Sequence, residues 1–85
     1  MKYTPNLTAD HMTQAARIIK HFIPDDYALK NQPIMGVSVD EDQRVKRIFF
    51  SGGRSISCCR VIHISTDSVQ EAWQFDDDST RIFCK

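Results

Sequence analysis

The fold is decided by the stretch RVKRIFFSGGRSISCCRVIHIS, residues 44–65. Two runs rich in β-branched and aromatic residues flank Gly52-Gly53. Glycine adopts without steric cost the positive φ that a type I′ turn requires at both central positions. The stretch therefore predicts a β-hairpin with a two-residue turn, in which Phe49 lies opposite Ile56.

The segments around this hairpin predict one helix and further strands. Apolar residues between Leu7 and Ile23 recur every three or four positions, which indicates an amphipathic helix over residues 7–23 with Thr8 as its N-cap. Residues 1–6 are expected to be a loose N-terminus. The predicted strands span 34–39, 44–51, 54–64, 69–76 and 80–84. Because short polar links join neighbouring antiparallel strands, we expect a five-stranded meander over residues 34–84.

Both faces of the predicted sheet carry apolar residues. In the hairpin, one face holds Phe49 and Ile56, and the other holds Ile48 and Phe50. A flat sheet with a single helix leaves one of these faces in water. We therefore expect an α+β domain, residues 1–85, whose antiparallel sheet is strongly bent or curled into a small barrel, or is covered by a partner or a second copy. A helix followed by five strands is also similar in order to Sm-like folds, which are small bent barrels.

The composition is that of a small globular domain without net charge. The chain has 85 residues, of which 41% are hydrophobic and 26% charged, and its formal net charge is zero. Its longest apolar runs are three residues, whereas a transmembrane helix needs about 20 and a signal peptide a run of about 7–15. Three cysteines are an odd number, which favours free thiols in a reducing compartment. We therefore expect a cytoplasmic protein.

Charge is unevenly distributed along the chain. Between residues 43 and 66 there are five basic residues and no acidic one, whereas residues 67–78 hold five acidic residues and no basic one. Neighbouring strands of one subunit can cancel these charges, and between subunits the same polarity favours docking or self-association. The candidate residues for binding a nucleic acid or a partner are Arg44, Lys46, Arg47, Arg54 and Arg60. The candidate interface edge in the last strand is Arg81, Ile82 and Phe83.

The sequence offers weak candidates for metal binding and thiol chemistry. Cys58, Cys59, Cys84 and His63 match the ligand number of a zinc site, but adjacent strand residues point to opposite faces and no C-x-x-C motif occurs. Cys59 and His63 lie about 13 Å apart along one strand, too far for a nucleophile and its base. We expect neither a metal nor a cofactor.

Other candidate residues also have structural explanations. The acidic clusters at residues 40–42 and 76–78 lack the alternating spacing of a calcium loop and are expected to be solvated turns. His11 and His21 are expected to face solvent from the helix. Trp73 is expected in the core, since a chain this short needs its large aromatic side chains inside.

The sequence therefore predicts a non-enzymatic binding module that acts through protein–protein contact or self-association. The alternative is a nucleic-acid-binding regulator of small-barrel type, which would use the basic residues of the hairpin for phosphate contacts. A third hypothesis is a thiol-dependent enzyme using Cys59. No membrane association is expected.

Overall fold

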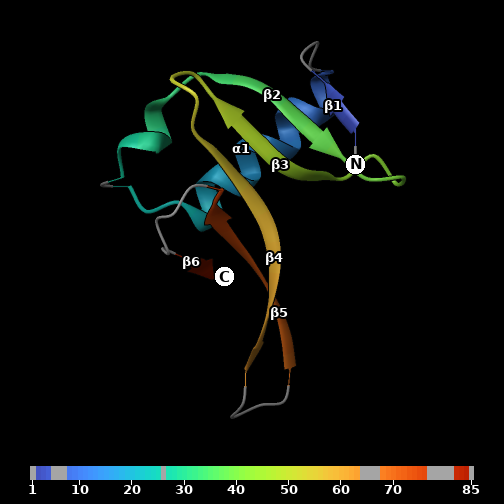
Figure 1. Cartoon of the computed structure of the whole chain (residues 1–85), viewed down its shortest axis with the longest axis vertical. Helices are drawn as coiled ribbons and strands as arrows, with labels where there is room; N and C mark the ends of the chain where they lie inside the picture. Colours follow the sequence, from blue (N-terminus) through green and yellow to red (C-terminus); the bar gives the residue numbers. More distant parts are fainter. Residues whose placement is uncertain (1, 5–7, 26, 64–67, 77–81, 85) are drawn as a thin grey trace.

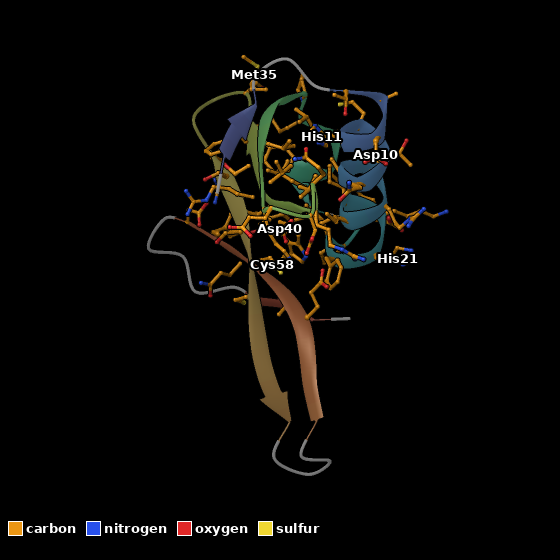
Figure 2. The ribbon with its side chains drawn as sticks, turned by 90° about the vertical axis from the view of Figure 1, so that its right-hand side faces the viewer. Asp10, His11, His21, Met35, Asp40 and Cys58 are labelled. Carbon is orange, nitrogen blue, oxygen red and sulfur yellow. The ribbon has the colours of Figure 1, made fainter. Side chains whose placement is uncertain are left out.

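One helix packs against one face of an antiparallel sheet (Figures 1 and 2). The computed structural model describes residues 2–4, 8–25, 27–63, 68–76 and 82–84. The helical elements are α1 (Ala9–Phe22) and the short 3-10 helix η1 (Ala28–Asn31). The strands are β1 (Lys2–Thr4), β2 (Ile34–Val39), β3 (Val45–Phe50), β4 (Ser55–His63), β5 (Ser68–Phe75) and β6 (Ile82–Cys84). The predicted α+β class is confirmed, and Thr8 is the N-cap of α1, accepting a hydrogen bond from the backbone N–H of His11.

The strands follow one another across the sheet in chain order, β1-β2-β3-β4-β5-β6. Four longer strands, β2 to β5, form its body, and β1 and β6 are three-residue strands at its edges. The predicted strand count of five is therefore wrong. The N-terminus was expected to be loose, but β1 pairs with residues 37–39 of β2 and satisfies backbone groups that would otherwise lie along an open edge.

The sheet is open, so the predicted closure into a small barrel is wrong. β1 and β6 are its two edges, and no described pairing joins them. Closure was expected because both faces of the hairpin appeared apolar. The observed register and two β-bulges instead collect most of the large apolar residues on the face that α1 covers.

The register of the β3–β4 hairpin differs by one residue from the predicted one. Gly52-Gly53 has the expected positive φ angles, 87° and 82°. However, the Phe50 N–H donates a hydrogen bond to the Arg54 carbonyl at 2.8 Å, so the loop has three residues. Ile48 therefore lies opposite Ile56. A shift of one residue moves every side chain of a strand to the other face relative to its neighbour, and here it joins these two isoleucines in one layer.

Two β-bulges in the β2–β3 pair adjust which residues reach the core. The register shifts around Met35 in β2 and around Lys46 in β3. The bulge at Lys46 allows both Val45 and Ile48 to be buried, although they are three residues apart. Met35 is 56% exposed, so the bulge in β2 places a large apolar side chain in solvent.

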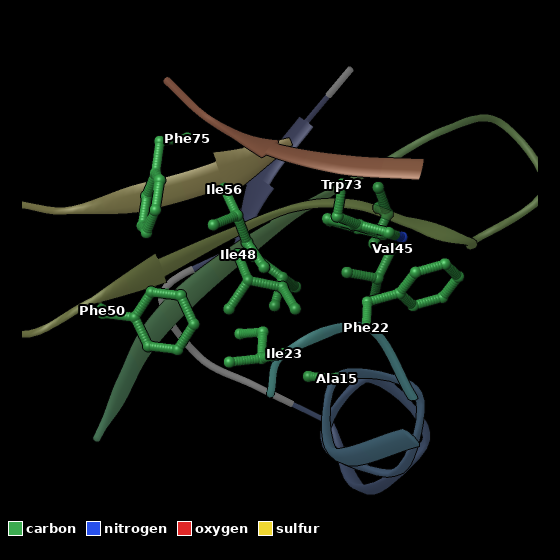
Figure 3. Close-up of a cluster of buried hydrophobic side chains, with 11 residues drawn as sticks. Ala15, Phe22, Ile23, Val45, Ile48, Phe50, Ile56, Trp73 and Phe75 are labelled. Atoms are coloured by element: carbon green, nitrogen blue, oxygen red, sulfur yellow. The ribbon is translucent and has the colours of Figure 1, made fainter. Parts of the chain in front are cut away.

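The core lies between α1 and the sheet (Figure 3). Trp73 is completely buried, as predicted, with its ring centroid 6.3 Å from that of Phe22. His11 was expected in solvent but is only 5% exposed, because it lies on the side of α1 that faces the sheet (Figure 2). It is one helical turn from the buried Ala15. The other buried hydrophobic residues of this cluster are Ile23, Val37, Val39, Val45, Ile48, Phe50, Ile56 and Phe75.

β4 and β5 continue beyond the body of the molecule as a two-stranded ribbon (Figure 1). β3 pairs with β4 only at residues 55–57, and β6 pairs with β5 only at residues 72–74. The β4–β5 pairing itself continues to His63 and Ser68. Among the described strands, residues 60–63 and 68–71 therefore pair only with each other. In the described part of the chain, no helix has the length and apolar character needed to cross a bilayer.

Candidate functional site

The basic residues predicted to form one binding surface lie in separate places. Arg44 and Lys46 line a groove beside α1. Arg47 lies on the face of the sheet away from α1, since it alternates with the buried Ile48. The Arg54 guanidinium carbon lies 4.3 Å from the centre of a core ring, that of Phe75. The structure therefore does not gather these four side chains into a single patch.

On the open face of the sheet, Asp76 connects three strands. Its carboxylate accepts hydrogen bonds from the hydroxyls of Ser55 and Ser57, both at 2.6 Å. The Nε atom of Arg47 lies 3.2 Å from the same carboxylate. This contact is an ion pair and not a hydrogen bond, because Nε has no aligned acceptor among the described residues. Asp76 thus ties β3 and β4 to the end of β5.

The Asp76 cluster neutralises one of the predicted binding residues. Arg47 is 41% exposed at its side chain and also lies 5.9 Å from the centre of the Phe49 ring. Its positive charge comes from the basic segment of the sequence, and its carboxylate partner comes from the acidic segment. The two charges cancel within one subunit, but across β4 and not between neighbouring strands as expected, since Arg47 belongs to β3 and Asp76 follows β5.

A groove of about 390 Å³ lies between α1 and the β2–β3 turn. Gln14 holds its two sides together, since its Nε2 donates to the Gln43 carbonyl and its Oε1 accepts the Val45 N–H, each at 2.9 Å. Acidic and basic side chains are equally represented in its lining, so the groove does not favour a phosphate or a metal ion. The charged residues of this lining are Asp10, Arg17, Asp42, Arg44, Lys46 and Glu71.

Asp40 organises the turn at the edge of this groove. Its carboxylate accepts the backbone N–H groups of Asp42 and Arg44, both at 2.9 Å. The bond from Arg44 is the main reason why the pKa of Asp40 lies below its usual value. Gln43 completes the turn with φ of 63°, a left-handed conformation that is uncommon for a residue other than glycine. The acidic residue that the sequence assigns to a solvated turn therefore has a structural role.

A second hollow, of about 610 Å³, lies between α1 and η1. Its apolar lining includes Met12, Ile19 and Ile34, and Met12 is 41% exposed. Lys20 and Lys30 also line it, and Lys30 forms an ion pair with a neighbouring aspartate. This hollow adds a modest apolar contact surface to the helix side of the molecule.

The cysteines lie on different faces of the sheet. Cys58 packs against the core, whereas the next residue, Cys59, is directed to the opposite face. Both side chains are half-buried. The side chains of His63 and Cys84, the other two candidate zinc ligands, lie outside the described residues. Among the side chains that are described, no three histidine, cysteine or acidic residues are grouped as metal ligands.

The ribbon contains the last of the predicted basic residues, and β6 contains the predicted interface edge. Arg60 of β4 lies opposite Glu71 of β5, so the register pairs two residues of opposite charge. The predicted interface edge becomes β6, in which Ile82 and Phe83 pair with residues 74 and 73 of β5, whereas Arg81 lies outside the described residues. The free edges of the ribbon were not predicted. The sequence feature that indicates them is strand length. The predicted 54–64 strand is longer than the neighbouring 44–51 strand, so part of its edge has no strand beside it.

Hydrogen-bond alternation determines which ribbon residues face outward. The Asp76 N–H donates to the Ser55 carbonyl at 3.1 Å, which marks these residues as a hydrogen-bonded pair of the β4–β5 ladder. Such pairs alternate along an antiparallel ladder, and the β4–β5 register is unbroken. Arg60 and Ile62 therefore direct their backbone N–H and C=O groups away from β5. On β5, Val69 does the same at the opposite edge.

The described residues thus offer three kinds of contact surface, namely the ribbon edges, the open face around Asp76 and the hollows beside α1. The ribbon edges differ from the others because they present backbone donors and acceptors with no strand partner among the described residues. No family model matches the chain, and no curated protein and no solved structure is similar to it.

We expect Asp76→Ala to reduce the free energy of unfolding by about 1.5–3 kcal/mol, the usual contribution of a hydrogen bond to a charged group. The substitution removes the acceptor of two hydroxyls and the partner of Arg47. Urea denaturation measures the change. Asp42→Ala, which removes an exposed acid from the β2–β3 turn, is the control and should change stability by less than about 0.5 kcal/mol. Equal effects of the two substitutions would contradict the role of Asp76 in connecting β3, β4 and β5.

Asp40→Asn should reduce stability more at neutral pH than in acid. Because the folded-state pKa of Asp40 is lowered, its carboxylate stabilises the folded protein above the unfolded-state pKa, and this contribution disappears as the pH falls through the folded-state pKa. Thermal unfolding of the parent and the variant across this range measures the difference. A difference that stays constant into acid would contradict the role of the charge.

Proposed function

We propose that the protein is a small, non-enzymatic binding module of the cytoplasm that acts through contact with another protein or with a second copy of itself. The observation that carries this proposal is the β4–β5 ribbon, in which residues 60–63 and 68–71 pair only with each other among the described strands. A two-stranded hairpin alone is marginally stable in water. An unpaired strand edge is a ready template for another chain.

The mode of contact that fits the ribbon is strand addition. In this mode an extended segment of the partner adds to a free sheet edge, and backbone hydrogen bonds supply much of the affinity. Arg60 and Ile62 present such groups on the β4 edge, and Val69 presents them on the β5 edge. In the sequence, two of these positions, Ile62 and Val69, are apolar.

The side chains that would otherwise suggest catalysis have packing roles. Cys58 contributes to the core, and Asp76 joins Ser55, Ser57 and Arg47 on the open face. These contacts account for the positions of the thiol and the carboxylate without a reaction.

The alternative function, a nucleic-acid-binding regulator, has less support from the geometry. Arg47 is paired with Asp76, and the groove beside Arg44 and Lys46 contains as many acidic as basic residues. Phosphate binding needs several uncompensated cations on one surface. Arg54 lies over the Phe75 ring, at a different place from the groove.

The ribbon hypothesis is tested with the double variant Ile62→Pro and Val69→Pro. Proline at these positions removes outward N–H groups but no donor of the β4–β5 ladder. Self-association is followed by light scattering, and any protein captured from an extract of the source cells is purified and its affinity measured. We expect the parent and the control Asp42→Ala to associate, and the double variant to lose association. Unchanged binding by the double variant, or a parent that binds neither itself nor another protein, would overturn the proposal.

Fluorescence anisotropy with labelled single-stranded RNA and double-stranded DNA tests the alternative. We expect no binding at about 50 mM salt. Binding that falls by orders of magnitude between about 50 and 200 mM salt would instead indicate several phosphate contacts. Replacing Arg44 and Lys46 with alanine would then show whether the groove beside α1 carries those contacts.

A further inference from the structure

We propose that the groove between α1 and the β2–β3 turn binds a short peptide that has a free ammonium group at one end and a free carboxylate at the other. This inference goes beyond the proposed function, because it assigns a small ligand to a site other than the ribbon edges. It is carried by three observations, namely the hydrogen bonds that fix the groove, the separation of opposite charges along it, and the absence of ion pairs among those charges in the described part of the chain.

Hydrogen bonds within the chain fix the shape of the groove. The Gln14 Nε2 atom donates to the Asp10 carboxylate at 3.0 Å and to the Gln43 carbonyl at 2.9 Å, while Oε1 accepts the Val45 N–H. Asp40 holds the turn on the other side through two backbone N–H groups. The groove volume of about 390 Å³ lies in the range of about 300–1,000 Å³ that is typical of small-molecule sites. A ligand that enters a preformed groove loses little free energy to ordering the protein.

The two ends of the groove differ in charge. The amide nitrogen of Gln14 lies beside Asp10 and the Gln43 carbonyl, and Asp42 is the neighbour of Gln43 in the chain. On α1, Arg17 follows Asp10 by seven residues, which is about 10 Å along the helix axis. One end of the groove is therefore acidic, and the end toward Arg17 is basic.

The β3 side of the groove has the same polarity. The amide oxygen of Gln14 accepts the Val45 N–H, and the next residue, Lys46, lines the groove. The remaining charged residues of the lining are Arg44, which lies between Gln43 and Val45, and Glu71, whose carboxylate accepts the Trp73 indole N–H. The charges available to a ligand are thus Asp10 and Asp42 at one end and Arg17 and Lys46 at the other.

These four charged side chains form no ion pair with any described residue. Side chains on a helix contact each other when they are three or four residues apart, so Asp10 and Arg17 are too far apart to neutralise each other. Gln14 occupies the position between them. A simple anion or cation would be attracted at one end of the groove and repelled at the other. A ligand with opposite charges at its two ends is attracted at both.

The separation of the charges sets the length of the ligand. An extended chain spans at most about 3.3–3.6 Å per residue, so three residues span about 10 Å. The ammonium group then lies at the Asp10 end and the carboxylate at the Arg17 end. Between them, Gln14 Oε1 accepts one hydrogen bond from Val45 and retains a second lone pair for a peptide N–H of the ligand. A tripeptide with free ends matches the groove in length, charge and hydrogen bonding.

Titration with triglycine, followed by nuclear magnetic resonance, tests the site. Triglycine carries both end charges and has no side chains that could bind elsewhere. We expect it to shift the side-chain amide signals of Gln14, with a dissociation constant in the millimolar range because ion pairs at exposed sites are weak. The control ligands are N-acetyl-triglycine, which lacks the ammonium group, and triglycine amide, which lacks the carboxylate. Each should bind about fivefold more weakly than triglycine.

Matched substitutions on α1 identify the residues that hold the ligand. Asp10→Asn and Arg17→Gln each remove one charge with little change in size, and each should weaken triglycine binding by about fivefold. In Asp10→Asn, the preference for triglycine over N-acetyl-triglycine should also decrease, because the ammonium group has lost a partner. Lys20→Gln removes a charge from the other hollow beside α1 and should bind like the parent. Circular dichroism confirms that the variants are folded.

Three outcomes would overturn the peptide site. They are equal binding of triglycine and its two blocked forms, unchanged binding by Asp10→Asn and Arg17→Gln, and no shift of the Gln14 signals at tens of millimolar triglycine. A loss in Lys20→Gln as large as that in Arg17→Gln would also contradict the site, since it would show a dependence on overall charge alone. These substitutions leave both ribbon edges unchanged, so failure here does not affect the proposed function.

Discussion

The hydrogen bond from the Phe50 N–H to the Arg54 carbonyl fixes the relation between the two halves of the sheet. It places Ile48 opposite Ile56, and the unbroken β4–β5 register then places Phe75 opposite Ile56. With the bulge at Lys46, this register brings most of the large apolar side chains to one face. One helix is enough to cover that face, and for this reason the sheet remains open.

The elements with a local signal were predicted well. Helix α1, its cap at Thr8 and the positions of β2 to β5 follow from the spacing of apolar residues and from turn chemistry. The register did not follow, because a glycine pair fits both a two-residue and a three-residue loop. No residue type in the sequence indicates the bulges at Met35 and Lys46. A bulge changes which side chains face the core, and this change can be seen only once the neighbouring strand is paired.

The candidate site was predicted only in part, because its contacts are long-range. The opposite charges of the two segments indicated that some pairs would cancel, but not that Asp76 would meet Arg47 together with Ser55 and Ser57. Burial of His11 depends on which stripe of α1 meets the sheet. The free edges of the ribbon arise from unequal strand lengths. Which residues these lengths leave unpaired is known only once the strand pairing is known.

The position of Trp73 links the ribbon to the core. The indole N–H donates a hydrogen bond to the Glu71 carboxylate at 3.2 Å, while the ring is completely buried beside Phe22. Glu71 is the residue of the free β5 run 68–71 that lies next to the part of β5 paired with β6. Trp73 is the single tryptophan of the chain. One natural fluorophore therefore reports on both the interior of the domain and the base of its projecting arm. Its emission is an intrinsic optical signal of events on the ribbon, without any label.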